Sequence, residues 1–446
     1  QFYSQNINTG APQNNLYDRI NKLLVSNEWS DCSFSVCGKE IKAHKLILGV
    51  SSPVFEAMFY GPLYTNEDII ITDIEPTIFQ LLLNYVYTDK LNINSIEDAF
   101  NMMYASRKYM LENLTEICTA YIQSNMDIDN VITVLNYPDY IQDNQLVSSA
   151  LKVFCQHADY LLKENKRNIT LTCMEKILNC NEMNISEKNL IKEVFEWTTH
   201  YCDQNSIKSD FQNRRDVLIK CALLKKLRLF TLSMADIEEI KSCQHNLLMN
   251  DEVDDLKQVV KSSGNITNRV ISTFDTKIMP RHALTLHWYL CHRAPIRSES
   301  PIVIDPVYNS IVHTRVKANK STFINSLNVQ SRMAPVFNAC NTNFYFEQFT
   351  ISVTCESSKK VITTFNFKSD IAYDSNIDVN FSKPLLFRKN LWYDISITWP
   401  QLNDSCYCLY AVESRDSYYT NGKIQFEFED LTKNGGSFLR ALKYCM

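Results

Sequence analysis

The stretch Lys42–Gly61, KAHKLILGVSSPVFEAMFYG, decides how the first part of the chain folds. Its two apolar runs have helical spacing, and Ser51-Ser52-Pro53 separates them. Proline cannot continue a helix because it lacks an N–H group, but it suits the first position of a new one. Ser52 can cap that second helix, and Gly61 is a natural stop. We therefore predict two short helices whose apolar faces pack on an adjoining sheet. These faces consist of Leu46, Ile47 and Val50, then Val54, Phe55, Met58 and Phe59.

The residues on both sides of this stretch predict a compact α/β unit over 16–125. Before it, an amphipathic helix is followed by a strand in which Cys32, Phe34 and Val36 alternate with polar residues. After it, a short strand over 69–71 precedes helices that begin near Pro76 and Ser95. The one apolar face of the first helix consists of Leu16, Ile20, Leu23 and Leu24.

The rest of the chain divides by pattern. Residues 1–15 are polar and predict a disordered lead, whereas 127–263 run on a 3.6-residue period and predict an all-helical array. Residues 264–295 read as a linker. Residues 296–446 contain short β-branched and aromatic segments at regular spacing, which predict an all-β sandwich.

Composition narrows the class of function. The 446 residues are 45% hydrophobic with a net charge of −5, which argues against a basic nucleic-acid-binding surface. No apolar run is long enough for a membrane span, and the fifteen cysteines include no CxxC pair. We expect no nucleic-acid or membrane partner, and a cytoplasmic protein, with the nucleus left open.

The residues of 29–61, WSDCSFSVCGKEIKAHKLILGVSSPVFEAMFYG, resemble a BTB/POZ domain. The features that carry the resemblance are an Asp31-x-x-Phe34 strand, an Ala43-His44-Lys45 step and the Ser-Ser-Pro break. The helical stretch 127–263 is similar to the BACK domain that follows BTB in adaptor proteins. It has a tryptophan helix at EVFEWTTHYC, an Asn-Arg-Arg step at 213–215 and LRLF at 227–230.

The C-terminal region is too short and too poor in glycine for a kelch propeller, which needs repeats of about 50 residues. VNFSKPLLF at 379–387, the aromatic LWYDISITW strand and GKIQFEFEDL resemble a PHR domain. The front of this region lacks the expected glycines, so it resembles a divergent PHR domain. The whole chain thus resembles the BTB-BACK-PHR adaptor group.

This resemblance implies a homodimer and a cullin-three partner. In such proteins the first helix exchanges across a BTB homodimer, which implies an interface at Leu16, Ile20, Leu23 and Leu24. Asp31 and Lys45 are expected to pair in or near it, because a buried charge without a partner is costly. The alternative for the first helix is that it packs only on its own domain. The alternative for Asp31 and Lys45 is that both are solvated surface charges.

The resemblance places the cullin surface on the second helix of the opening stretch and the loop after it. The residues expected there are Met58, Phe59, Tyr60, Leu63, Tyr64 and Tyr104. Many cullin-binding BTB domains have a hydrophobic-x-acidic triplet in this loop, whereas this chain reads Leu63-Tyr64-Thr65 and lacks the acid. Met58 and Phe59 could equally belong to the core.

The expected function is that of a substrate adaptor for a cullin-three ubiquitin ligase, with an unknown protein substrate captured by the C-terminal domain. The alternative is a BTB scaffold or transcriptional co-regulator that does not bind cullin. His282, His287, Cys291 and His292 lie close in sequence, but no second ligand pair stands at a zinc spacing, so no metal or cofactor is expected. No catalytic or phosphate-binding motif is found, and we expect no enzyme.

Overall fold

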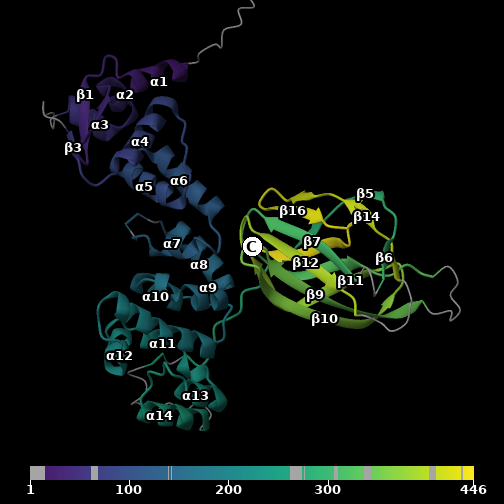
Figure 1. The fold of residues 1–446 in the computed structure, drawn as a ribbon. Coiled ribbons are helices and arrows are strands. Elements are labelled where there is room, and N and C mark those ends of the chain that lie inside the picture. The colour runs from purple at the N-terminus through teal and green to yellow at the C-terminus, as the bar shows by residue number, and fades with distance from the viewer. Residues whose placement is uncertain are drawn as a thin grey trace, which may run out of the picture. The chain divides into compact units, whose positions relative to one another are not determined.

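The structure is a computed structural model that forms two compact units, residues 1–283 and 284–446 (Figure 1). It describes residues 16–61, 69–138, 140–141, 143–261, 274–275, 277–305, 310–335, 343–400, 408–432 and 435–446, with only the backbone at 16–18. The predicted disordered lead and residues 264–273 of the predicted linker therefore lie outside the described residues. We describe each unit by itself.

The N-terminal part of the first unit is a small sheet with helices around it. The sheet has the order β2-β1-β3, in which β1 pairs antiparallel with β2 and parallel with β3. Its strands are β1 (Cys32–Val36), β2 (Lys39–Ala43) and β3 (Ile69–Ile71), and its helices are α1 (Leu16–Ser26), α2 (Lys45–Ser51), α3 (Pro53–Tyr60), α4 (Pro76–Thr88), α5 (Ile96–Lys108) and α6 (Glu112–Asn125). The predicted α/β character is confirmed.

An aromatic cluster forms the centre of this core. The ring of Phe34 on β1 lies 5.8 Å from that of Phe55 and 5.0 Å from that of Phe79. Phe55 also stacks on Tyr109 with ring centroids 4.3 Å apart. The alternation of Cys32, Phe34 and Val36 is thus used as predicted, since Phe34 and Val36 are fully buried.

The helix break at Ser52-Pro53 is confirmed. The Ser52 hydroxyl accepts a hydrogen bond from the Phe55 N–H at 3.2 Å and donates one to the Tyr109 carbonyl at 2.6 Å. The predicted core-facing side of α2 is wrong, however, because Leu46 is 68% exposed and Val50 is 83% exposed. Leu48 faces the core instead, and residues two positions from it on a helix point about 200° away.

The described residues between 127 and 261 form a helical region, as their period predicts. Its elements are α7 (Val131–Asn136), α8 (Asn144–Gln156), α9 (Ala158–Asn165), η1 (Lys166–Asn168), α10 (Leu171–Leu178), α11 (Glu187–Gln204), α12 (Phe211–Lys220), η2 (Leu224–Lys226), η3 (Leu229–Thr231), α13 (Met234–Lys241) and α14 (Asn250–Lys261). Trp197 of α11 is buried and donates its indole N–H to the Ile169 carbonyl at 2.8 Å. Arg215 is buried and pairs with Glu252 at 2.5 Å.

The second unit is all β. Six strands run in the order β10-β9-β12-β7-β16-β15 and four in the order β11-β8-β17-β4, and two small two-stranded sheets flank them (Figure 1). The strands are β4 (Tyr289–His292), β5 (Pro295–Ser298), β6 (Ile302–Ile304), β7 (Ile311–Ala318), β8 (Thr322–Gln330), β9 (Phe344–Cys355), β10 (Lys360–Ala372), β11 (Asn376–Phe387), β12 (Trp392–Thr398), β13 (Cys408–Tyr410), β14 (Glu413–Arg415), β15 (Tyr418–Thr420), β16 (Gln425–Asp430) and β17 (Leu439–Cys445).

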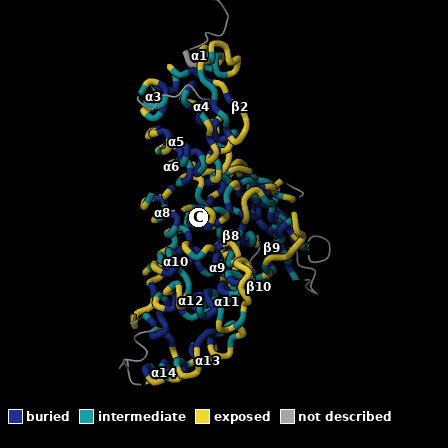
Figure 2. Tube along the Cα trace, turned by 90° about the vertical axis from the view of Figure 1, so that its left-hand side faces the viewer, coloured by how far each residue is buried: buried dark blue, intermediate teal, exposed yellow. Residues whose placement is uncertain are grey.

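The two larger sheets of this unit share one hydrophobic core, as a sandwich requires. Val316, Ile351 and Val353 from the six-stranded sheet pack in one cluster with Leu327 and Val379 from the four-stranded sheet. β10, at the edge of its sheet, alternates exposed and half-buried residues along most of its length (Figure 2). The all-β prediction for this region is confirmed.

The predicted linker ends too late in the sequence. β4 pairs antiparallel with β17, so that Tyr289 lies opposite Tyr444 and His292 lies opposite Ala441. Cys291 on this strand is fully buried in the core. Residues 289–295 therefore belong to the β unit, because β4 pairs with β17 and Pro295 lies opposite Arg415 of β14 (Glu413–Arg415).

Candidate protein-interaction surface

Asp31 joins the start of β1 to the start of α2. Its carboxylate accepts a hydrogen bond from the backbone N–H of Lys45 at 2.8 Å. The first N–H groups of a helix have no partner within the helix. A carboxylate there accepts a hydrogen bond from one of them and interacts favourably with the positive end of the helix dipole. The predicted Asp31–Lys45 contact is thus present in one chain, but it uses the lysine backbone, and Asp31 is exposed.

His44 fixes the same junction from inside. Its Nε2 lies 2.8 Å from the Glu28 carbonyl oxygen, which can only accept, so Nε2 carries the proton. Its Nδ1 then accepts from the Tyr87 hydroxyl at 2.8 Å, and that hydroxyl accepts from the His44 backbone N–H at 2.9 Å. Burial raises the pKa of Tyr87, which keeps the phenol protonated and able to donate. Each of these polar groups is therefore satisfied.

We expect Tyr87→Phe to lower the free energy of unfolding by about 1–3 kcal/mol, because His44 keeps two buried polar groups that lose their partner. Denaturant unfolding of the full chain, with the N-terminal transition followed separately, measures this. Tyr104→Phe is the matched control, since the Tyr104 hydroxyl bonds an exposed carboxylate. Equal losses for both variants would contradict a structural role for the His44 network.

Four large apolar side chains on α1, on α2 and in the turn before β1 are exposed. Leu46 and Val50 lie on α2, Val25 near the end of α1 is 75% exposed, and Trp29 is 82% exposed. Trp29 has a φ of 59°, a left-handed conformation that is uncommon for a bulky residue. Since Glu28 and Asp31 on either side are bonded to residues 44–45, Trp29 is held beside the start of α2. Leu46 and Val50 share one face of α2, and Trp29 is held near the start of that helix, so these side chains are the candidates for a protein-contact surface.

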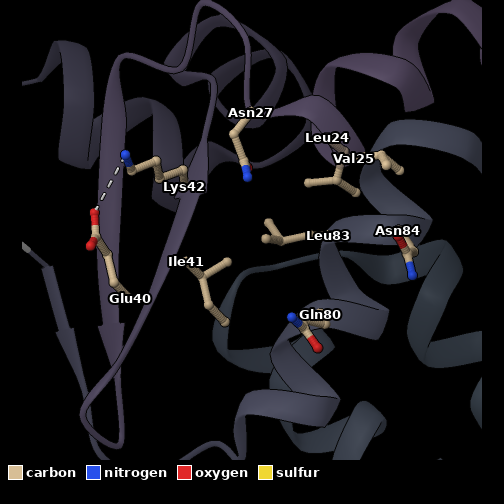
Figure 3. Close-up of a pocket in the computed structure, with 9 residues that line it drawn as sticks. All are labelled: Leu24, Val25, Asn27, Glu40, Ile41, Lys42, Gln80, Leu83 and Asn84. Carbon is tan, nitrogen blue, oxygen red and sulfur yellow. Dashed lines mark ion pairs between the residues drawn. The ribbon is translucent and has the colours of Figure 1, made fainter.

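The predicted interface helix is only partly covered within its own domain. Ile20, Leu23 and Leu24 are half-buried, α1 packs against α4, and the side chain of Leu16 lies outside the described residues. A groove of about 510 Å³ runs between α1, β2 and α4, and Figure 3 shows Leu24, Ile41 and Leu83 pointing toward one another in it. The sequence indicated the α1 residues as part of an interface, but it did not indicate Leu46 and Val50 of α2. The only sequence signal for these two was their i, i+4 spacing on either side of Leu48.

The residues predicted for cullin binding separate into three groups. Phe59 is only 6% exposed and its ring lies 6.2 Å from that of Phe34, so it is a core residue rather than part of an exposed patch. Met58 is half-buried, whereas Tyr60 is exposed and its ring lies over α2, where a methyl group on Gly49 would come within 2.9 Å of it. Leu63 and Tyr64, with Thr65, lie outside the described residues.

Tyr104 on α5 takes part in a polar cluster that the sequence did not indicate. Its hydroxyl donates to the Asp73 carboxylate at 2.6 Å, and the Lys108 ammonium pairs with the same carboxylate at 2.6 Å. These two hydrogen bonds lower the pKa of Asp73, and the bond to Asp73 raises the pKa of Tyr104. Asp73 therefore fixes the Tyr104 side chain at the surface, near the end of β3.

The histidines and the cysteine considered for zinc do not converge. Cys291 points into the β core, while His287 and His292 are exposed. His282 belongs to the other unit, where its backbone pairs with residues 181–183. Within the described residues no group of three or more His, Cys, Asp or Glu side chains is arranged to hold a metal ion.

No helix among the described residues has the length and apolar character needed to span a membrane.

Comparison with known proteins identifies the N-terminal domain. Residues 20–126 match the family model of the BTB/POZ domain. BTB/POZ domain-containing protein 6-A of Danio rerio is 30% identical over 219 residues, which cover 48% of this chain and 40% of that protein. BTB/POZ domain-containing protein 3 of Homo sapiens is 27% identical over 220 residues, which cover 49% and 41%. The matched part thus spans less than half the length of these curated relatives.

Among solved structures, the BTB domain of zebrafish PATZ1 is matched over its full length and over 27% of this chain, with 21% identity and a TM-score of 0.23. The family match shows that this chain carries a BTB/POZ domain. BTB/POZ domains commonly mediate dimerisation and protein interactions, and proteins that contain them often act as adaptors or scaffolds.

Proposed function

We propose that this chain is the substrate adaptor of a cullin-three ubiquitin ligase. In this proposal the BTB/POZ domain forms a homodimer and docks on the cullin, the helical region serves as a BACK-like spacer, and the β unit, as a divergent PHR-like domain, captures a protein target. The chain contributes no catalytic group, because transfer of ubiquitin belongs to other subunits. Two target-binding domains on one dimer raise the effective concentration of the target at the transfer site.

The apolar surface of α2 is the observation that carries the proposal. Leu46 and Val50 are exposed on α2, Val25 and Trp29 are exposed before β1, and a second BTB/POZ domain presenting the same residues would cover them. A two-fold interface uses one surface twice, so an apolar, self-complementary face suits it. The adjoining α1 residues Ile20, Leu23 and Leu24 would extend the contact, with Leu16 at the start of the helix.

The cullin part of the proposal rests on α3 and α5. Tyr60 at the end of α3 is exposed, and aromatic side chains are frequent anchors at protein interfaces. Tyr104 is held at the surface by Asp73, and Met58 is half-buried between the core and the surface. Leu63 and Tyr64 supply further apolar residues after α3, by sequence alone.

The compartment proposed for this adaptor is the cytoplasm, with the nucleus left open. The thirteen cysteines in the described part of the chain are free thiols, as expected in a reducing compartment.

The second candidate function is a BTB scaffold or transcriptional co-regulator that does not bind cullin. The observation that favours it is Thr65, which stands where many cullin-binding BTB domains have an acidic residue.

Titration of the full chain with the N-terminal domain of cullin-three, by calorimetry and by size exclusion with light scattering, tests the proposal. We expect submicromolar binding in a two-to-two complex, which Leu63→Asp abolishes. Val361→Asp is the matched control, because Val361 on β10 of the β unit is an exposed apolar residue outside the proposed surface, and it should leave binding unchanged. A folded dimer that does not bind at high micromolar concentration would exclude the cullin adaptor and leave the scaffold function.

A further inference from the structure

Strand β10 forms an open edge of the six-stranded sheet (Figure 1). The sheet order ends on this strand, and among the described strands only β9 pairs with it. The other side of the sandwich is closed, because the Tyr419 hydroxyl of β15 donates to the Leu290 carbonyl of β4 at 3.1 Å. An unpaired edge presents N–H and C=O groups that another strand can bind. A further strand can therefore be added at β10.

A hydrogen bond just after β10 shows which of its residues face the open edge. The Tyr373 N–H donates to the Asn343 carbonyl at 3.2 Å, which makes these two residues a bonded pair. In an antiparallel ladder such pairs alternate with pairs that do not bond, and the β9–β10 register is continuous over this half of the strand. Counting back in steps of two, Ser369 bonds to β9. The backbone groups of Lys368 and Asp370 therefore point to the open edge.

The side chains along this edge differ between its two faces. Lys368 and Asp370 are exposed on the face away from the core, and neither forms an ion pair with a described residue. Ser369 between them is half-buried on the opposite face, where Phe367 and Ile371 pack against the core but are only partly covered. The edge thus has a pair of opposite charges on one face and an incompletely covered apolar row on the other.

We propose that β10 pairs antiparallel with β10 of a second copy of this chain, with Ser369 on the two-fold axis. In this register Lys368 lies opposite Asp370 of the second copy, and Asp370 lies opposite its Lys368. Phe367 lies opposite Ile371 in the same way, so each copy covers the apolar row of the other. Opposite charges and apolar pairs across antiparallel strands stabilise pairing, and a two-fold contact repeats each pair.

The two charges select both the register and the occupant. A pairing centred on Phe367 would place Lys368 opposite Asn366 and would leave both charges without a partner. Because the charges at 368 and 370 complement each other across a two-fold axis, a second copy fits this edge without any further requirement. A strand from another protein would have to supply the matching charges itself.

The contact is small, since the proposed register pairs only residues 366–372 of each copy. Small contacts are weak, so we expect this pairing at high micromolar rather than low micromolar concentration. It lies on the β unit, whereas the proposed BTB/POZ interface lies on the other unit, so the two contacts do not compete for the same residues. This self-pairing goes beyond the proposed adaptor function and does not depend on it.

Cross-linking at the two-fold axis tests the register. Position 369 would face itself as a pair that does not bond, where Cα atoms lie about 4.5 Å apart and a disulfide can form. We expect mild oxidation of the full chain with Ser369→Cys, at high micromolar concentration, to link two copies at this position, as identified by peptide mass spectrometry. Thr363→Cys is the matched control. Thr363 is half-buried on the same face of β10, but lies opposite residue 375 in this register, so it should not link to itself.

Charge variants of the Ser369→Cys chain test the pairing chemistry. Asp370→Lys places like charges opposite each other twice, and the link should form about tenfold more slowly. Lys368→Asp should have the same effect, whereas an equimolar mixture of the two variants restores both charge pairs and should restore the rate. No link at 369, or a link whose rate these variants leave unchanged, in chains with native circular dichroism, would overturn the proposal. The edge would then be left to a strand from another protein.

Discussion

Replacing both Leu46 and Val50 with aspartate is expected to convert the proposed homodimer into a folded monomer. In the proposed dimer both side chains pass from solvent into the interface, and burial of such a side chain contributes roughly 1.5–3 kcal/mol. A carboxylate in their place removes that contribution and adds the cost of burying a charge next to its symmetry mate. The dimer dissociation constant should rise by a factor of about 1,000 or more. Sedimentation equilibrium at low micromolar concentration measures the change.

The fold should survive this double substitution because both side chains are largely exposed in the single chain. Circular dichroism and the thermal transition of the monomer check that point. Ile70→Asp places the same charge on an exposed position of the edge strand β3 and should leave the dimer intact. A double variant that remains dimeric would show that α2 does not form the interface and would direct attention to α1 alone.

The sequence predicted correctly those elements whose signals are local. The Ser52-Pro53 break was predictable because the groups that form it lie within four residues of one another, with the Phe55 N–H donating to the Ser52 hydroxyl. Ser233 and Asp236 likewise form a reciprocal capping box at the start of α13, within three residues of one another. The strands with strict alternation, such as β9, were also recognisable from sequence alone.

The orientation of α2 could not be predicted in this way. The helix has seven residues, and apolar side chains lie on both of its sides, so its period does not distinguish them. What selects Leu48 for the core is the surrounding packing, which is set by residues distant in sequence. β4 was missed for a similar reason, because four residues with two exposed positions give no strand signal until β17 pairs with them.

The polar contacts of the candidate surface were only partly predictable. Asp31 and Lys45 were recognised as a pair from their charges, but the bond runs to a backbone N–H, since the first turn of α2 needs an acceptor. Asp73 was not recognised at all as the partner of Tyr104, because 31 residues separate them and neither belongs to a local motif.

Arg281 lies in a segment that reads as a linker from sequence, yet it is among the most buried charges of the chain. Its guanidinium pairs with the Glu187 carboxylate at 2.6 Å, and the two side chains are 1% and 5% exposed. It also donates to the carbonyls of Leu178 at 2.8 Å, Cys180 at 2.9 Å and Lys226 at 3.0 Å. One side chain therefore connects residues from α10, α11 and η2.

Arg281→Met is expected to destabilise the helical region by about 3–5 kcal/mol, because it leaves the Glu187 carboxylate buried without its counter-ion and removes a donor from three carbonyls. Native-state hydrogen exchange at the α11 amides measures this loss within the full chain. Lys163→Met is the control, since the Lys163–Asp159 pair is an exposed i, i+4 pair worth about 0.3–0.5 kcal/mol.

A double-mutant cycle separates the ion pair from the rest of the packing. Glu187→Leu alone should also be destabilising, because it leaves the buried guanidinium without its carboxylate, whereas Arg281→Met with Glu187→Leu should cost less than the sum of the two. An Arg281→Met loss as small as that of Lys163→Met would mean that residues 280–283 are not seated on the helical region. The loss expected here instead follows from burial, since a charge that is 1% exposed cannot regain water when its partner is removed.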